Sequence, residues 1–207
     1  MLKYIKGIGG SGLNRVIRGN IAPLEIRISD AELSARLSAP SSANDPKIKE
    51  VIEGVLSVCE VKFVATFLDI LKNEDGEVFF DGFSVRSLAL SKYFAESPRT
   101  VLFVITLGSA VDRLIMKKKS ISLSLGFLYD AVASAIAEGA CDTLHARLCE
   151  DEMRQNRFSP GYADCPLTLQ RQIFDLLSAD KYIGVKLLDS CLMSPMKSVS
   201  AFIALPI

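Results

Sequence analysis

The chain has 207 residues, of which 49% are hydrophobic, and its 24 basic and 24 acidic side chains leave no net charge at pH 7. This length allows one domain with a substantial core. The balanced charge excludes the basic footprint that nucleic-acid binding requires. The five cysteines contain no C-x-x-C pair and indicate free thiols in a reducing compartment. The start, MLKYIKG, lacks the apolar core of a signal peptide, so we expect a cytoplasmic protein.

The first half of the chain is predicted to contain a weakly patterned segment and then a mixture of helices and strands. Residues 1–44 begin glycine-rich and carry little regular pattern, so we expect a lead-in to a domain over residues 45–207. Apolar residues recur at helical spacing in 30–37, 46–60 and 83–97. The predicted strands are 22–29, 61–71, 76–80 and 100–108, with the middle two joined by an Asn-Glu-Asp-Gly turn.

The second half is predicted to be mainly helical, with strands near the end. The predicted helices are 109–119, 120–155 and 167–179, and the predicted strands are 186–193 and 198–205. The long helical segment carries Asp130 and Glu138 among its apolar residues, which favours a buried helix of a soluble protein over a membrane span. Because helices and strands do not alternate regularly, we expect an α+β fold with a mixed, largely antiparallel sheet.

A glycine-rich stretch near the start formally matches a dinucleotide-binding motif. GIGGSG, from Gly7 to Gly12, fits the pattern G-x-G-x-x-G. That motif works only at a turn between a strand and a helix, where the backbone can approach a pyrophosphate. MLKYIK precedes it and NRVIRG follows, so the required context is absent. A glycine-rich lead-in is the favoured interpretation.

Three polar residues share one face of the long predicted helix. Glu138, Asp142 and His145 are spaced four and three residues apart. A helical carboxylate-x-x-His pair can bind metal, but only with matching ligands from other helices. His145 is the only histidine in the chain, which argues against a metal site and against Ser-His or Cys-His nucleophiles. We therefore interpret these residues as a polar stripe and predict no catalytic or metal-binding residues.

The loop RFSPGYADCP, Arg157 to Pro166, carries the most concentrated chemistry. Pro-Gly favours a tight turn, which we expect to expose backbone N–H groups. The Arg157 guanidinium can present a planar fork to a carboxylate or phosphate, and Tyr162 adds a flat face with a hydroxyl. These residues suit a small anionic or zwitterionic ligand. They equally suit a rigid turn between helices in which the arginine caps the preceding helix.

Several segments together resemble one family. RFSPGYADCP is similar to the R-x-x-P-G-Y-x-x-C-P signature of the activation domain of cobalamin-dependent methionine synthase. IAEGACDTLH resembles a helix of that family, with Glu138 seven residues before His145. The tail IGVKLLDSCLMSPMKSVSAFIAL and the segment TLGSAVDRLI also resemble family segments. The resemblance covers about residues 45–207, and Leu167-Thr168 replace a histidine found after Cys-Pro in the large members.

The resemblance implies a binding site for S-adenosylmethionine. Arg157 would hold the methionyl carboxylate, and Glu138 would hold the amino group or a water beside it. Ser159 and Gly161 would supply backbone contacts, while Tyr162 would lie against the ligand or the incoming corrin. In this family the ligand remethylates cobalamin after one-electron reduction by a flavoprotein, and the protein mainly positions the methyl donor.

We therefore expect a free-standing relative of the activation domain that is inactive by itself. The chain has no cobalamin-binding Asp-x-His-x-x-Gly motif, so the cobalamin must come on a partner methyltransferase. Two alternatives remain open at this point. In the first, the chain activates a corrinoid methyltransferase other than methionine synthase. In the second, the chain is an interaction module that has kept the fold and lost the ligand. Neither alternative involves nucleic acid or a membrane.

Overall fold

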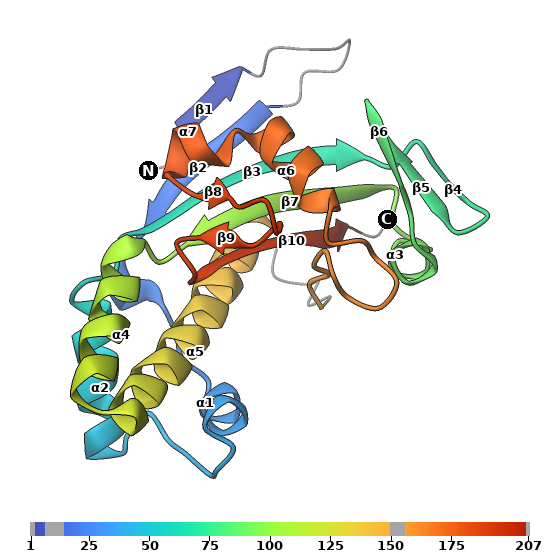
Figure 1. Cartoon of the computed structure of the whole chain (residues 1–207). Helices are drawn as coiled ribbons and strands as arrows, with labels where there is room; N and C mark the ends of the chain where they lie inside the picture. The colour runs from blue at the N-terminus through green and yellow to red at the C-terminus, as the bar shows by residue number, and fades with distance from the viewer. Residues whose placement is uncertain (1–2, 7–14, 150–155, 206–207) are drawn as a thin grey trace.

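A five-stranded antiparallel sheet forms the centre of the protein in the computed structural model, which describes residues 3–6, 15–149 and 156–205 (Figure 1). The strand order is β1-β2-β3-β7-β10. The strands are β1 (Lys3–Lys6), β2 (Arg15–Ile21), β3 (Val61–Asp69), β7 (Arg99–Thr106) and β10 (Ser198–Leu205). Every strand pairing in the described part of the chain is antiparallel. The predicted α+β class with a largely antiparallel sheet is confirmed.

Strand β7 lies inside the sheet and is buried on both faces. Its side chains alternate between two separate cores: Phe103 and Ile105 join one, while Leu102 and Val104 join the other. This alternation follows from the two-residue period of a strand. A continuous apolar run such as TVLFVIT is therefore what a strand covered on both sides requires.

Four helices cover one face of the sheet. They are α1 (Asp30–Leu37), α2 (Pro46–Leu56), α4 (Ser109–Ile121) and α5 (Leu123–Leu148). Helix α2 begins where the Asp45 carboxylate accepts bonds from the N–H groups of Lys47 and Ile48, with Pro46 at the first helical position. Helix α5 carries 26 residues and is the longest of the four. Among the described helices, none is long and apolar enough to cross a lipid bilayer.

The opposite face is covered by smaller elements. A three-stranded sheet and a helix pack at one end, and two helices and a short hairpin pack along the rest (Figure 1). The elements are β4 (Lys72–Glu74), β5 (Glu77–Phe80), β6 (Phe83–Arg86), α3 (Leu88–Tyr93), α6 (Leu169–Leu177), α7 (Ala179–Ile183), β8 (Lys186–Leu187) and β9 (Met193–Ser194). The loop from residue 157 to 166 joins the α5 side of the sheet to this second layer.

The segment expected to be a lead-in is part of the fold wherever the structure describes it. Strand β2 pairs with β3 inside the main sheet, and Ile21 is buried there. Helix α1 buries Leu33 completely in the core shared with α5. Where the structure describes the expected lead-in of residues 1–44, the segment from residue 15 onward is not separate from the domain, because Val16, Ile17, Ile21, Ile26 and Leu33 are buried in it while Leu24 is exposed. The motif Gly7–Gly12 lies outside the described residues.

Four predicted elements differ from the structure. Residues 22–29 form no strand: Pro23–Glu25 is a 3-10 turn, since Pro23 has no N–H for a strand ladder. The hairpin is β4–β5, with positive φ at Asp75 and Gly76, and β3 pairs with β2 and β7 instead. Residues 83–97 begin as strand β6 before α3 starts, and residues 186–193 hold two short strands, β8 and part of β9.

Candidate functional site

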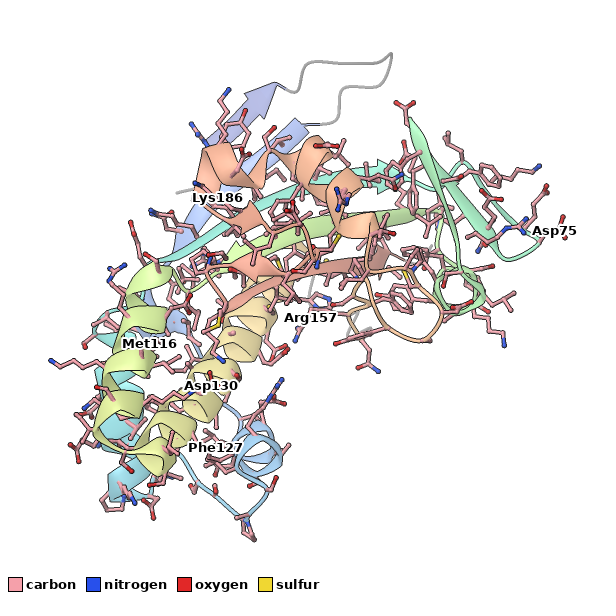
Figure 2. The ribbon with its side chains drawn as sticks, viewed as in Figure 1. Asp75, Met116, Phe127, Asp130, Arg157 and Lys186 are labelled. Carbon is pink, nitrogen blue, oxygen red and sulfur yellow. The ribbon has the colours of Figure 1, made fainter. Side chains whose placement is uncertain are left out.

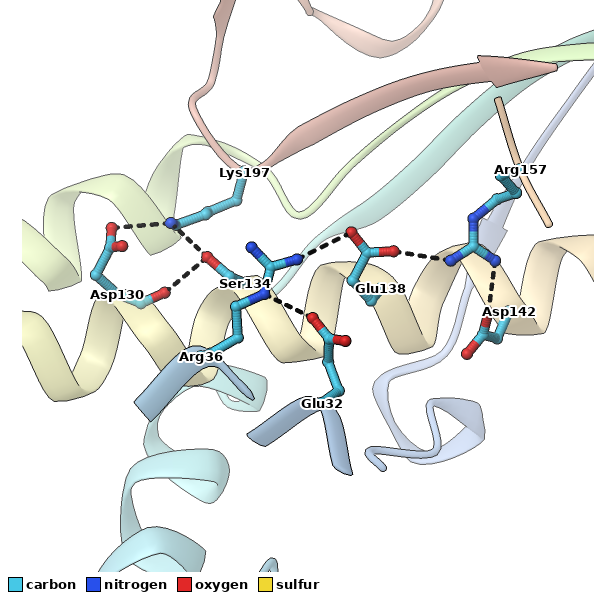
Figure 3. Close-up of polar contacts among 8 residues, drawn as sticks. All are labelled: Glu32, Arg36, Asp130, Ser134, Glu138, Asp142, Arg157 and Lys197. Atoms are coloured by element: carbon cyan, nitrogen blue, oxygen red, sulfur yellow. Dashed lines mark hydrogen bonds and ion pairs between the residues drawn. The ribbon is translucent and has the colours of Figure 1, made fainter. Parts of the chain in front are cut away.

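The candidate site is built on helix α5, where two acidic residues lie one turn apart. Glu138 and Asp142 share one face because four residues nearly complete a helical turn. Arg157 approaches this face from the loop that follows α5. Its Nη2 lies 2.7 Å from Oε2 of Glu138, and its Nη1 lies 2.5 Å from Oδ1 of Asp142 (Figure 3). The structure thus brings together Glu138 and Arg157, the two residues expected to hold the amino-acid end of a ligand.

The Arg157 guanidinium is held in a largely covered position. Its side chain is only 18% exposed, whereas the Asp142 side chain is 67% exposed. Burial acts to lower the pKa of Arg157, but the neighbouring Cys141, Asp142 and Glu138 outweigh it, so the pKa lies above its ordinary value. Because its pKa is raised, Arg157 remains a cation at all accessible pH values. In Figure 2, Arg157 lies beside the end of α5 that is next to the sheet, well away from Asp130, which is on α5.

A second arginine reaches Glu138 from helix α1. Nη2 of Arg36 lies 3.3 Å from Oε1 of Glu138, and Nε of Arg36 lies 2.6 Å from Oε1 of Glu32. Glu32 and Arg36 are four residues apart on α1, so they form a pair along that helix. Each oxygen of Glu138 consequently faces a different arginine (Figure 3).

A hollow of about 290 Å³ lies beside the contact between α5 and the segment that leads into α1. The lining residues are Arg27, Ser29, Ala31, Glu32, Ala135, Glu138, Gly139, Asp142 and Arg157. Both charge signs therefore line the same small volume, which suits a ligand that carries both a carboxylate and an ammonium group.

Gly139 sets how closely the two walls of the hollow approach. A Cβ atom at this position would lie 2.3 Å from the carbonyl oxygen of Arg27. Only glycine therefore lets the segment before α1 rest directly on α5. The close approach keeps Glu32 and Glu138 on opposite sides of one narrow space.

The loop after α5 is fixed by its own hydrogen bonds. Gly161 has φ near +91°, which glycine tolerates, and its N–H donates to the carbonyl of Cys165 at 3.0 Å. The N–H of Tyr162 donates to the carbonyl of Ser159 at 3.1 Å. The expectation that the Pro-Gly turn exposes these N–H groups is wrong, because the turn closes on itself and uses them internally.

Three of the expected site residues stay in this loop beside the hollow. Ser159 is half-buried, while Gly161 and Tyr162 are exposed, and none of the three lines the hollow. Residue Tyr162 is 56% exposed, and its ring meets the Phe158 ring edge to face, with centroids 5.9 Å apart. Phe158 itself exchanges two backbone hydrogen bonds with Phe202 of β10. The loop is thus anchored to the main sheet directly after Arg157.

Asp164 anchors the far end of the loop, a role that no sequence pattern indicated. Its carboxylate accepts bonds from the Ser87 hydroxyl at 2.7 Å and from the N–H groups of Leu88 at 2.7 Å and Ala89 at 3.1 Å. The hydrogen bond from Ser87, followed by those from Ala89 and Leu88, lowers the pKa of Asp164. The loop therefore caps the start of α3 while presenting Arg157 to α5.

The acidic stripe of α5 continues away from the hollow. Nζ of Lys197 lies 2.8 Å from Oδ1 of Asp130 and 2.9 Å from the hydroxyl of Ser134 (Figure 3). Lys197 comes from the turn before β10. Within residues 3–6, 15–149 and 156–205, no group of three or more His, Cys, Asp and Glu side chains is placed to hold a metal ion.

The five cysteines are all free thiols. Cys141 lies on α5 between Glu138 and Asp142 in sequence, is fully buried, and burial raises its pKa to about 12. Burial also raises the pKa of Cys165, in the loop, to about 11. Both thiols stay protonated at neutral pH, which makes them core residues rather than nucleophiles.

Comparison with solved structures defines the class of the fold. A structure described as the MetH reactivation domain bound to AdoHcy superposes with a TM-score of 0.70 at 16% sequence identity. The match covers 90% of this chain and 77% of that one. The architecture is therefore that of a reactivation domain.

Comparison with family models gives the family. The model for the activation domain of vitamin B12 dependent methionine synthase matches residues 88–205, which include Glu138, Arg157 and the loop. No curated protein sequence matches the chain. The chain belongs to the family of vitamin B12 dependent methionine synthase activation domains.

Proposed function

We propose that this protein binds S-adenosylmethionine at the Arg157–Glu138 pair and acts as an activation module in the reductive remethylation of cob(II)alamin on a cobalamin-dependent methionine synthase. The observation that carries the proposal is the pair itself: a forked cation 2.7 Å from a carboxylate at the edge of a hollow lined by both charge signs. The family membership and a related fold described with AdoHcy support the choice of ligand.

The amino-acid end of the ligand matches the charges of the pair. A carboxylate can take two parallel N–H bonds from the Arg157 fork, and an ammonium group can donate to Glu138. Asp142 is the more exposed of the two partners of Arg157, with 67% of its side chain exposed against 30% for Glu138. The ligand carboxylate therefore replaces Asp142 on Arg157, and Asp142 returns to solvent at little cost.

The loop supplies the remaining contacts in this proposal. Since the N–H groups of Gly161 and Tyr162 are already bonded, the loop contacts the ligand through other atoms. These are the Ser159 hydroxyl, the Gly161 backbone without a side chain above it, and the exposed face of Tyr162. Tyr162 then lies between the ligand and an incoming corrin ring.

The chemical step requires little from the chain beyond placement. Cobalamin carried by a cobalamin-binding methionine synthase would be the methyl acceptor after one-electron reduction, for which a flavoprotein can be the electron source, and the donor would leave as S-adenosylhomocysteine. Arg157, Glu138 and the loop hold the sulfonium so that its methyl group points outward, which converts methyl transfer into a reaction between prepositioned partners. We place this activity in the cytoplasm.

Isothermal titration calorimetry with S-adenosylmethionine tests the proposal. The wild-type protein should bind, and Arg157→Ala should weaken binding by about 1.5–3 kcal/mol because a charged hydrogen bond is lost. Arg113→Ala is a matched control, since Arg113 is an exposed arginine on α4 that bonds only to Ser109 among the described contacts. Absence of binding at millimolar ligand would leave an interaction module as the better explanation.

The partner requires a separate experiment. Each purified candidate cobalamin methyltransferase, first oxidised to its cob(II)alamin form, is mixed with this protein, a reductant and S-adenosylmethionine carrying a labelled methyl group. Recovery of activity with label on the cobalamin of methionine synthase supports the proposal. Recovery only with another corrinoid protein would identify that protein as the partner instead.

A further inference from the structure

Arg36 occupies a position that the proposed ligand needs. Oε2 of Glu138 faces Arg157, and Oε1 of Glu138 faces Arg36 at 3.3 Å. An ammonium group that pairs with Glu138 while its carboxylate binds Arg157 must approach the oxygen that Arg36 now contacts. Two cations cannot share that oxygen without mutual repulsion.

The contacts of Arg36 show which way it can move. Its bond to Glu32 is short, at 2.6 Å, whereas its contact with Glu138 is longer, at 3.3 Å. Glu32 lies on the same helix, so Arg36 keeps this partner when it leaves Glu138. The side chain of Arg36 is 42% exposed, compared with 18% for Arg157, so it has direct access to solvent.

The wall that carries Arg36 does not need to move with it. Leu33 on α1 is fully buried against the core. Gly139 fixes the segment before α1 directly on α5, and Ser34 exchanges two hydrogen bonds with Ser41 beyond the helix. A change at Arg36 is therefore a change of one side chain on a fixed backbone.

We propose that Arg36 is a displaceable counter-ion of Glu138, which pairs with Glu138 in the absence of ligand and keeps only its bond to Glu32 when a ligand ammonium group takes its place. This inference rests on the proposed function, because it assigns the ammonium of S-adenosylmethionine to Glu138. It adds a specificity determinant on α1: a ligand without an ammonium group cannot compensate Glu138 for the loss of Arg36.

Calorimetry on Arg36 variants tests the inference. Arg36→Gln, which removes the competing charge, should tighten S-adenosylmethionine binding by about two- to tenfold. Arg36→Met keeps the apolar part of the side chain and should also tighten S-adenosylmethionine binding. It is the replacement variant if Arg36→Gln does not fold. Arg36→Lys retains the charge and should bind within about twofold of the wild type. Arg113→Gln, which removes an exposed arginine of α4 that does not line the hollow, should leave binding unchanged.

The outcomes separate this inference from the proposed function. Binding by both neutral variants but not by the wild type supports it, as does tightening in both. If the wild type binds and the neutral variants bind equally or more weakly, Arg36 is a structural tether and the inference alone fails. Equal tightening by Arg36→Lys would also overturn it, because charge would not be the cause. If neither the wild type nor any variant binds, both proposals fail.

Discussion

The Asp164 carboxylate in the loop after α5 accepts a 2.7 Å hydrogen bond from the hydroxyl of Ser87, a residue 77 positions earlier in the chain. Ser87 in turn caps α3 by accepting from the N–H of Leu90. The loop that presents Arg157 is therefore fixed at one end by α3 and at the other by the Phe158–Phe202 bridge to β10. The position of Arg157 therefore depends on two elements that are distant in sequence, α3 and β10.

Replacement of Asp164 should lower stability in a pH-dependent way. Its pKa is lowered in the folded protein, so its contribution is fully present above the ordinary aspartate pKa of about 3.9 and is lost as the pH falls through the folded value. Urea unfolding of Asp164→Asn should show a clear loss of stability at pH 7. The gap to the wild type should begin to narrow below about pH 4 and close once the pH lies below the folded pKa of Asp164. A gap that is constant across this range would contradict the capping role.

Gly139→Ala should damage the hollow. The new Cβ would lie 2.3 Å from the Arg27 carbonyl oxygen, so the backbone before α1 must shift, at a cost of about 1–3 kcal/mol in unfolding free energy. Gly54→Ala on α2 is the matched control, because its Cβ meets the movable side chain of Tyr129 at 3.3 Å. Chemical denaturation measures both variants. Equal stabilities of the two variants would show that the wall tolerates displacement.

Arg157→Lys should test the shape of the cation rather than its charge. Lysine cannot bond two carboxylates with a planar fork, so Glu138 and Asp142 would no longer be bridged. We expect S-adenosylmethionine affinity to fall about tenfold, measured by calorimetry, with the melting temperature nearly unchanged. Affinity equal to that of the wild type would mean that only a point charge is required.

Cys141 should resist alkylation in the folded protein. With a pKa of about 12 set by burial, only about one thiol in ten thousand is ionised at pH 8, and the sulfur is covered. Iodoacetamide at pH 8 should therefore label Cys141 only after unfolding, as read by peptide mass spectrometry. Rapid labelling of the native protein would show that the middle of α5 opens.

The sequence predicted helices and strands correctly where the apolar residues followed a single clear pattern. Strand β10 occupies 198–205 as predicted, because its apolar run is continuous and bounded by turn residues. Helix α1 likewise occupies the predicted 30–37. Strand β2 was missed because RVIRGNI contains Arg18, Gly19 and Asn20, which suit a strand only once β3 lies beside it.

The candidate site was less accessible to sequence reasoning. The spacing of Glu138 and Asp142 predicts a shared helix face, but the arginine that bridges them comes from a loop beyond the helix end. Only the family resemblance linked Glu138 to Arg157. No local signal ties Arg36 to Glu138, which is 102 residues away. The closed hydrogen bonds of the Pro-Gly turn depend on positive φ at Ala163, which residue type does not indicate.

The place of strand β2 inside the main sheet determines which fragments of the protein can fold with an intact site. Because β2 pairs along β3 and α1 forms one wall of the hollow, a fragment starting at residue 45 would expose a hydrogen-bonding edge on β3 and lose four of the nine residues that line the hollow. The Arg36–Glu138 contact joins residues 102 positions apart, so it requires both ends of that stretch to be present in one chain. Under the proposed function, ligand binding would thus depend on the segment that carries Arg27 and Glu32, and the portion matched by the family model, residues 88–205, should not bind when expressed alone.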